Sequence, residues 1–444
     1  MKTPIRIIVA ADFKGTAGDK GLHQVLPGKT DDLIQQLGPE ITLKSGVTVQ
    51  IASMSDLEVS AIKSTVLSAD ATAEDVTAVL HDKTFQQVEG SLRGIDFLAS
   101  TLPEEGVRLE VLDTPFDNLR RRVFDDIMTP DYNGQSDVPA TIILGDFDFS
   151  YKGESFEVFR DLAKMGEAIR TPFVGQTGAD FFNLKHLLHL PSIKNPTAQL
   201  SQSSYAPYHE FRISDTAFWA CLMMNRYLMR APYALDDYKE PASPSKPEQY
   251  LFGRGIWILG ANLIKSFATK GHLVGISGLG TGGEQMKLPI RELPLTRTDK
   301  VLTPLEAPLP IDIVEGLPYL GLSPLSQIPP EMGGQSQPGM IYLHLAANMH
   351  QIPDPEQKQF GLLTVEASLA YSLMLGRITN LAAKYASNGS PDGESIKSAL
   401  LEDMWTKESD EIEVALESDV LKLKYAPHLV IHTRPFEISL ELPL

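Results

Sequence analysis

Apolar runs along the chain predict β-strands at both ends and in the middle. Residues 5–9 are mostly β-branched and lead into Ala10-Ala11-Asp12, which predicts a buried strand that enters a loop. Residues 141–144 form a continuous apolar run, which is typical of a central strand covered on both faces. Over residues 436–442 apolar and polar side chains alternate strictly, and this pattern predicts a half-buried strand near the C-terminus.

Apolar residues at helical spacing predict helices between these strands. The clearest series is Phe85, Val88, Leu92, Ile95 and Leu98, which gives a helix with one buried face. A further helix is expected around Phe156, Phe159, Leu162 and Ala163, and others over residues 214–229, 251–269, 357–385 and 394–407. Between residues 107 and 174 strands and helices alternate, which favours an α/β fold with a mainly parallel sheet flanked by helices.

Composition and charge narrow the class of protein. The 444 residues suggest two or three packed units, and 39 basic against 57 acidic residues give a net charge of −18, unsuited to binding nucleic acid. The single cysteine, Cys221, cannot form an internal disulfide, which fits a reducing compartment. No apolar stretch reaches the roughly 18 residues of a membrane span, and the apolar run at the N-terminus is too short for a signal peptide. We therefore expect a cytosolic protein without membrane insertion.

A glycine-rich segment is the most prominent candidate for enzyme chemistry. Gly278–Gly283 satisfies G-x-G-x-x-G after the strand-like residues 272–277. A dinucleotide site also needs a helix that opens at the last glycine, and here Pro289 follows within a few residues. We therefore interpret the segment as a loop, with a nucleotide-binding α/β enzyme as the less favoured alternative.

Two other groups of polar residues are weaker candidates. His186 and His189 are three positions apart, but no third ligand lies near them, so we expect no metal site. Asp146 and Asp148 follow the predicted central strand, where α/β enzymes often hold acidic residues. Without a basic partner nearby in the sequence, turn formation and helix capping explain them more simply. We therefore expect no catalytic residues and no cofactor.

The two terminal strands have two interpretations. An isolated strand is not stable in water, so residues 5–9 and 436–442 must pair with other strands. Pairing within their own fold is one interpretation. In the other, they are arms that complete sheets of neighbouring subunits, with Ile5, Ile7 and Val9 at one end and Ile438, Leu440 and Leu442 at the other. Spacing alone favours the first interpretation.

From about residue 80 onward, the chain resembles the large subunit of the type VI secretion contractile tail sheath. Residues 85–94 (FQQVEGSLRG) are similar to the family's LEGSWRGL helix, with Leu92 in place of the usual Trp, and residues 142–149 (IILGDFDF) to its LIGDYEF strand and turn. Residues 227–233 and 317–325 are similar to its RFLLRLPY and LSDLGFIPL segments. The final strand is similar to the close of the family's sequence. The resemblance implies a contractile tail sheath fold, with mixed sheets flanked by helices and terminal strand arms exchanged between neighbours.

The N-terminus resembles a different protein of the same apparatus. Residues 5–13 (IRIIVAADF) are similar to the RIVVLGDFSG opening of the small sheath subunit. We therefore expect residues 1–60 to be a region like the small subunit, residues 61–350 an α/β body like the large subunit, and residues 351–444 to hold C-terminal helices and the terminal arm.

The function implied by the resemblance is mechanical. Copies of the chain would polymerise in the bacterial cytoplasm as a helical sheath around an inner tube protein, joined to a baseplate, and contract to drive the tube through a target envelope. A baseplate or cap component with the same fold is the nearest alternative. The acidic residues Glu394, Glu402 and Asp403 of the predicted helix 394–407 are candidates for facing the tube.

Overall fold

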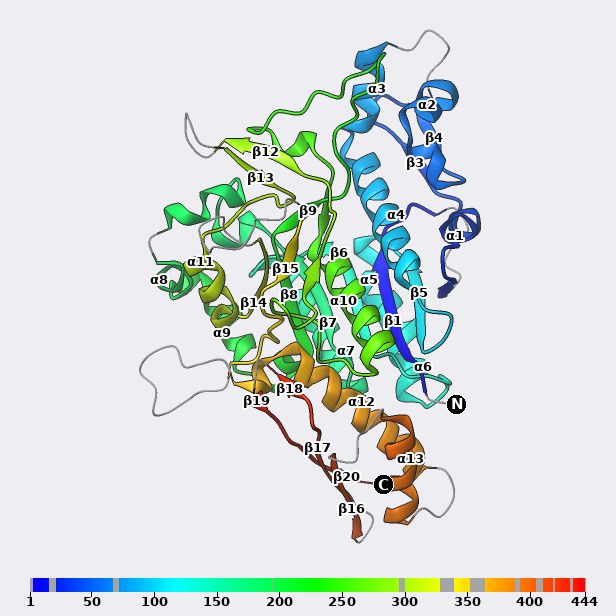
Figure 1. Ribbon diagram of the computed structural model, residues 1–444, viewed down its shortest axis with the longest axis vertical. Helices are drawn as coiled ribbons and strands as arrows, with labels where there is room; N and C mark the ends of the chain where they lie inside the picture. The colour runs from blue at the N-terminus through cyan, green and yellow to red at the C-terminus, as the bar shows by residue number, and fades with distance from the viewer. Residues whose placement is uncertain are drawn as a thin grey trace.

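The computed structural model describes most of the chain and centres on one large mixed sheet (Figure 1). The described residues are 3–15, 21–66, 72–193, 195–294, 300–327, 339–351, 364–387, 392–404, 410–417, 420–431 and 434–443. Within them, nine strands form a sheet in the order β11-β15-β14-β8-β7-β6-β1-β5-β2. Its strands are β1 (Ile5–Ala11), β2 (His23–Val25), β5 (Val107–Asp113), β6 (Ile142–Asp148), β7 (Phe173–Thr177), β8 (Ala220–Met224), β11 (Glu284–Gln285), β14 (Leu322–Ser326) and β15 (Ile341–Leu343).

Strand direction divides this sheet into a parallel centre and antiparallel edges. The neighbours from β5 through β1, β6, β7 and β8 to β14 all run parallel. At the edges, β2 runs antiparallel to β5, and β15 antiparallel to both β14 and β11. The expected α/β fold with a mixed sheet is thereby confirmed.

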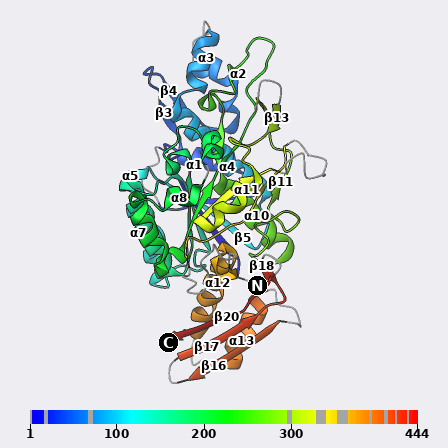
Figure 2. The same ribbon diagram turned by 90° about the vertical axis from the view of Figure 1, so that its left-hand side faces the viewer.

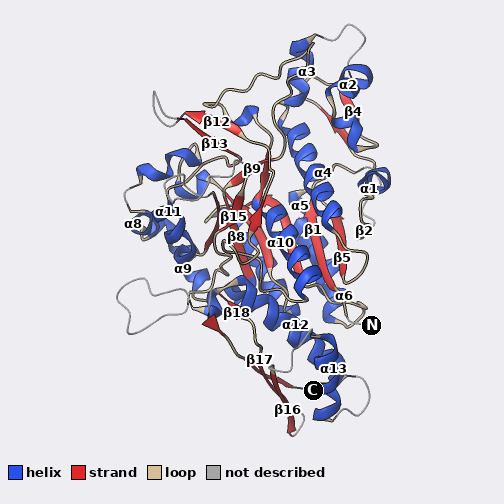
Figure 3. Cartoon of the chain, viewed as in Figure 1, coloured by secondary structure: helices blue, strands red, loops and turns tan. Residues whose placement is uncertain are grey.

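Helices cover both faces of the sheet (Figure 3). On one face, α4 (Lys83–Thr101) and α10 (Gly255–Lys270) pack against each other over a core that includes Ile7, Val9 and Leu144. On the other, α5 (Phe116–Val123) and α7 (Gly153–Ile169) cover a core that includes Ile8 and Ile143. Successive residues of β1 thus point into two different cores, as expected of a central strand.

Smaller elements surround this body. They are α1 (Thr30–Leu37), α2 (Val59–Ala61), α3 (Ala73–Leu80), α6 (Thr129–Tyr132), α8 (Pro196–Leu200), α9 (Ala206–Arg212), α11 (Ile311–Gly316) and the strand pairs β3 (Glu40–Thr42) with β4 (Thr48–Gln50), β9 (Arg226–Leu228) with β10 (Phe252–Arg254), β12 (Arg291–Pro294) with β13 (Lys300–Thr303), and β18 (Val430–Ile431) with β19 (Arg434–Pro435). Among the described helices, none is long and apolar enough to cross a membrane.

A C-terminal unit extends from one end of the body, as two perpendicular views show (Figures 1 and 2). It contains α12 (Leu369–Ala386), α13 (Gly393–Asp403) and a sheet in the order β16-β17-β20, made of Glu411–Glu417, Val420–Ala426 and Ile438–Pro443. The Asp392 side chain caps α13 by accepting a hydrogen bond from Ser395 N. Helix α13 packs on β16 and on α12, and α12 also contacts β20.

The helix expected over residues 357–385 begins at Leu369, after a 3-10 turn at Val365–Ala367, and residues 357–363 lie outside the described residues. Two further expected elements differ from the structure. Residues 214–229, predicted as one helix, form a single 3-10 turn over Asp215–Trp219 followed by strands β8 and β9. Residues 272–277, read as a strand, form bends and turns. In the first case an apolar run of helix-forming residues fills a sheet position buried on both faces, which periodicity alone cannot distinguish from a helix.

Candidate functional site

The three-stranded C-terminal sheet has one apolar face and one charged face. Along β17, Leu421, Leu423 and Tyr425 are buried and lie opposite Leu442, Leu440 and Ile438 of β20. Ile438 is fully buried, whereas Leu440 and Leu442 are half-buried against the same core. The predicted alternation of the terminal strand therefore corresponds to a face that packs on the helices of its own unit.

The opposite face of this sheet carries charges of both signs. Lys422 pairs with Glu417 at 2.6 Å, and Lys424 pairs with Glu437 at 3.0 Å. Across the strands, Lys422 also lies opposite Glu441. These side chains are largely exposed, so each pair contributes little to stability. This face suits contact with water or with a polar partner.

The two outer strands of this sheet have open edges within the described chain. There, β16 and β20 each pair with β17 and with no second strand. An edge strand presents unpaired backbone N–H and C=O groups, which can pair with a strand of another molecule. The C-terminal sheet therefore has the geometry needed for strand addition at either side.

The N-terminal strand is placed differently. Strand β1 pairs with β5 along one edge and with β6 along the other, so both of its edges are used within the chain. Ile5, Ile7 and Val9 are fully buried in the core beneath α4 and α10. In the described fold this segment is a central strand of its own sheet, which matches the interpretation that spacing favoured.

The three acidic residues proposed to face a tube are not equivalent. Glu394 and Glu402 lie exposed on α13, whereas Asp403 is only 4% exposed. The Asp403 carboxylate accepts hydrogen bonds from Thr3 N at 2.6 Å, from Thr3 Oγ1 at 2.7 Å and from the Tyr385 hydroxyl. Asp403 is therefore an internal acceptor, and its assignment to a tube-facing surface is wrong.

These contacts form a clasp between the N-terminal segment and the C-terminal unit, defined here as Thr3, Arg377, Tyr385 and Asp403. Arg377 of α12 donates to Thr3 O at 2.8 Å, and its guanidinium lies 5.2 Å from the Phe267 ring centre. Burial lowers the pKa of Arg377 to about 10. Burial acts to raise the pKa of Asp403, but hydrogen bonds from Tyr385 and Thr3 outweigh it and hold the pKa below its usual value. No pattern in the sequence marks this clasp, because its members lie up to 400 positions apart.

Asp146 and Asp148 have a basic partner that sequence reasoning missed. Arg254, just before α10, donates to Asp146 at 3.2 Å and to Asp148 at 3.1 and 2.8 Å. Ser91 of α4 also donates to Asp146, at 2.6 Å. Burial acts to raise the pKa of Asp148, but the charge of Arg254 outweighs this effect and lowers the pKa. The two carboxylates are thus part of an ion-pair cluster between strand ends and helices, and the interpretation as simple turn and cap residues is wrong.

The other candidates for chemistry do not assemble into a site. The Glu284 carboxylate accepts hydrogen bonds from the backbone amides of Gly280 and Gly282, so the glycine loop is filled by the chain itself. The segment directly after the loop is strand β11 rather than a helix. The His186 and His189 rings lie 6.0 Å apart, and among the described residues no group of three or more potential ligands could hold a metal ion.

Comparisons with known proteins agree on one family. The family model for VipB, described as the EvpB/VC_A0108 tail sheath N-terminal domain, matches residues 65–330. A type VI secretion system sheath protein, TssC1 of Pseudomonas aeruginosa, is 23% identical over 276 residues, which are 57% of this chain and 55% of that protein. The chain thus spans about half the length of the curated relative it matches. The matched region of the family model covers α4, α10 and the parallel centre of the large sheet, apart from β1.

Proposed function

The chain belongs to the tail sheath family of the type VI secretion system, and on that premise we propose that it is a structural subunit of a contractile sheath. Many copies polymerise in the bacterial cytoplasm around an inner tube protein on a baseplate, and contraction drives the tube through a target envelope. The chain performs this role as a polymer and catalyses no reaction. The observation that carries the proposal is the family match over residues 65–330.

The C-terminal sheet supplies the link between copies in this proposal. A strand from a second copy adds to the open edge of β16 or of β20, so that backbone hydrogen bonds continue from subunit to subunit. Such a link resists extension because many hydrogen bonds act together, and it leaves each body free to rotate as a unit. The mixed charges on the exposed face keep the sheet in contact with water before assembly.

The N-terminus belongs to the same proposal. Residues 5–13 resemble the small sheath subunit, so the chain combines small-subunit and large-subunit segments in one polypeptide. In this proposal the small-subunit-like segment contributes strand β1, which lies between β5 and β6 of the large sheet. The exposed residues Glu394 and Glu402 of α13 are the acidic residues that remain available to face an inner tube.

Electron microscopy of the purified chain tests this function. We expect negative-stain images to show hollow tubes with a regular helical repeat, either with the chain alone or after co-expression with the inner tube protein. Isolated discs or caps would instead indicate a baseplate or cap component with the same fold. Dispersed single copies under every condition, with and without the tube protein, would contradict a polymerising role.

Nucleotide binding is tested separately. The Glu284 carboxylate already accepts hydrogen bonds from backbone amides of the glycine loop. Equilibrium dialysis with labelled ATP or NAD should therefore detect no saturable binding. The variant Glu284→Ala frees these amides but leaves β11 in place of a helix, so it should also bind neither ligand. Stoichiometric binding by the unaltered chain would favour the enzyme alternative.

A further inference from the structure

The clasp holds a buried cation and a buried carboxylate on the same residue. Arg377 Nη2 donates to Thr3 O at 2.8 Å, and the Asp403 carboxylate accepts from Thr3 N at 2.6 Å and from Thr3 Oγ1 at 2.7 Å. Both charged side chains are buried. Because the N–H and C=O groups of one residue are close together, the two charged groups are neighbours that Thr3 separates.

Arg377 is buried without a carboxylate in contact with it. Among the residues that the structure describes it forms no ion pair, and its hydrogen-bond acceptors are two neutral carbonyl oxygens, Thr3 O and, at 3.4 Å, Pro4 O. A hydrogen bond from a guanidinium to a carboxylate is stronger than one to a neutral carbonyl. Burial lowers the pKa of Arg377, and the charge of Asp403 acts in the opposite direction. Asp403 is therefore a better partner for Arg377 than the one it has.

Two small cavities beside Arg377 leave its side chain space to turn. Each has a volume of about 20 Å³, which is enough for about one water molecule. Thr3 and Pro4 line the first cavity, Phe267 and Met404 line the second, and Arg377 lines both. Dense packing would hold a buried side chain in one conformation, and around this guanidinium the packing is interrupted on two sides.

Thr3 can leave the clasp without removing β1 from the sheet. Only Pro4 lies between Thr3 and Ile5, the first residue of β1. Ile5 is fully buried, and its backbone N–H donates to Gly106 O at 3.0 Å, so the strand is held independently of the clasp. Withdrawal of Thr3 therefore breaks the contacts with Arg377 and Asp403 and leaves the register of β1 unchanged.

We propose that the clasp is a conformational switch with two arrangements. In the closed arrangement, which the structure shows, Thr3 separates Arg377 from Asp403. In the open arrangement Thr3 withdraws and Arg377 pairs directly with Asp403. Since each charge keeps a partner in both arrangements, opening avoids the large cost of leaving a buried charge unpaired. The switch thus connects β1 to the C-terminal unit or releases it, and it operates within a single chain whether or not copies form a sheath.

A double-mutant cycle on the dispersed chain tests the proposal through its sign. Deleting residues 2–4 removes Thr3, and Arg377→Met removes the cation. We expect the deletion to lower Tm at least twice as much in Arg377→Met as in the unaltered chain, because only Arg377 can replace Thr3 as the partner of Asp403. If Thr3 is a simple bridge, Arg377→Met has already lost its contact, and the deletion should cost less there. The new terminal amine is the same in both backgrounds.

Asp403→Asn repeats the cycle from the other side of the pair. The deletion should again lower Tm more than in the unaltered chain, since Arg377 then loses Thr3 O and finds no carboxylate. The matched control is Glu402→Gln, at the exposed neighbouring position, in which the deletion should cost the same as in the unaltered chain. An equal or smaller loss in either Arg377→Met or Asp403→Asn would overturn the proposal, and so would a loss of the same size in Glu402→Gln.

A crystal structure of the chain without residues 2–4 shows the open arrangement directly. We expect the Arg377 guanidinium to lie within hydrogen-bond distance of the Asp403 carboxylate, with β1 in its present register. An Arg377 side chain that keeps its position and stays separated from Asp403 would overturn the proposal, whatever the Tm values are. Both experiments use the dispersed chain, so their failure is distinct from a failure of the chain to form tubes.

Discussion

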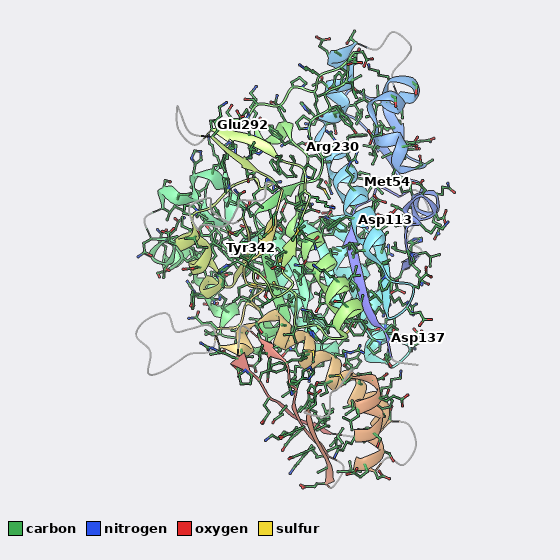
Figure 4. The ribbon with its side chains drawn as sticks, viewed as in Figure 1. Met54, Asp113, Asp137, Arg230, Glu292 and Tyr342 are labelled. Atoms are coloured by element: carbon green, nitrogen blue, oxygen red, sulfur yellow. The ribbon has the colours of Figure 1, made fainter. Side chains whose placement is uncertain are left out.

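Arg230, which Figure 4 labels, forms ion pairs with two carboxylates in the interior and shows how this chain accommodates buried charge. Its guanidinium contacts Glu89 of α4 at 2.7 Å and Glu240 at 2.6 Å, and it lies 4.3 Å from the Tyr233 ring centre. Burial acts to raise the pKa of Glu240, but hydrogen bonds from His81 and Arg230 outweigh it and lower the pKa. The three charges fix α4 to the segment that follows β9.

Replacing Arg230 should therefore be costly. Arg230→Met leaves Glu89 and Glu240 buried without their shared cation, and loss of one partner of a buried pair costs roughly 3–5 kcal/mol. Urea denaturation followed by circular dichroism should show this as a lower midpoint. The control Arg121→Met removes an exposed arginine whose contact with Asp125 is 3.6 Å, and should cost at most about 1 kcal/mol. Similar small losses in both variants would contradict the structural role of Arg230.

Asp403 of the clasp provides a prediction that depends on pH. Asp403→Ala leaves Thr3 N and the Tyr385 hydroxyl without their acceptor, which should cost about 1–3 kcal/mol at pH 7. The folded-state pKa of Asp403 lies below the ordinary value of 3.8, so its contribution is complete above that value and is lost as the pH falls through the folded pKa.

Thermal unfolding at pH 7 and at pH 3 measures this dependence. The difference in Tm between the unaltered chain and Asp403→Ala should be largest at pH 7 and smaller at pH 3. Glu402→Ala, at the exposed neighbouring position, is the control and should leave Tm unchanged at pH 7. A difference that grows as the pH falls would refute the assignment of Asp403 as an ionised acceptor.

At the scale of elements, the clear patterns in the sequence correspond to real strands and helices. The apolar runs at residues 5–9 and 141–144 are β1 and β6, and the periodic series from Phe85 is α4. Alternation over residues 436–442 corresponds to β20. In these segments local preference and burial agree, so the pattern suffices to identify the element.

The segment around β8 could not be assigned in the same way. Residues 220–224 are Ala, Cys, Leu and two Met, which have no strong preference for a strand, and all five are buried. Their place between β7 and β14 decides the conformation, and Asn225 ends the strand with a positive φ of 71°. Likewise, Arg254 joins Asp146 across 108 positions, so only the folded chain reveals that the carboxylates have a partner.

Strand β20 can be shortened to test whether its edge joins copies of the chain. Ile438 is fully buried within its own unit, so removing the entire terminal strand would also damage the fold. Deleting residues 439–444 keeps Ile438 and removes the open edge together with the half-buried Leu440 and Leu442. Each of these contributes less than the roughly 1.5–3 kcal/mol of a fully buried leucine. The shortened chain should therefore stay folded by circular dichroism but fail to form tubes.

The control for this deletion is Glu441→Gln, which alters an exposed side chain of β20 and keeps the backbone edge. It should form tubes as the unaltered chain does. Normal tubes from the shortened chain would show that the edge of β20 is not a link between copies. Unfolding of the whole chain would show that β20 is essential to its own fold.

At the scale of the whole molecule, the body and the C-terminal unit are distinct in shape but tied together. The unit extends along the longest axis of the molecule, away from the large sheet (Figures 1 and 2). Buried side chains of helix α12 belong to the same hydrophobic core as α4 and α10 of the body. The clasp also connects α12 and α13 to the segment just before β1. A force applied at the C-terminal sheet would thus reach the centre of the large sheet through Thr3 and β1.

We propose that this chain is a sheath subunit whose copies are joined through the C-terminal sheet. Cryo-electron microscopy of the assembled polymer, at a resolution that traces the backbone, tests it most directly. We expect a helical array in which a strand from a second copy pairs with the outer edge of β16 or β20. Tubes in which both edges stay unpaired, or in which copies touch only through their bodies, would contradict it.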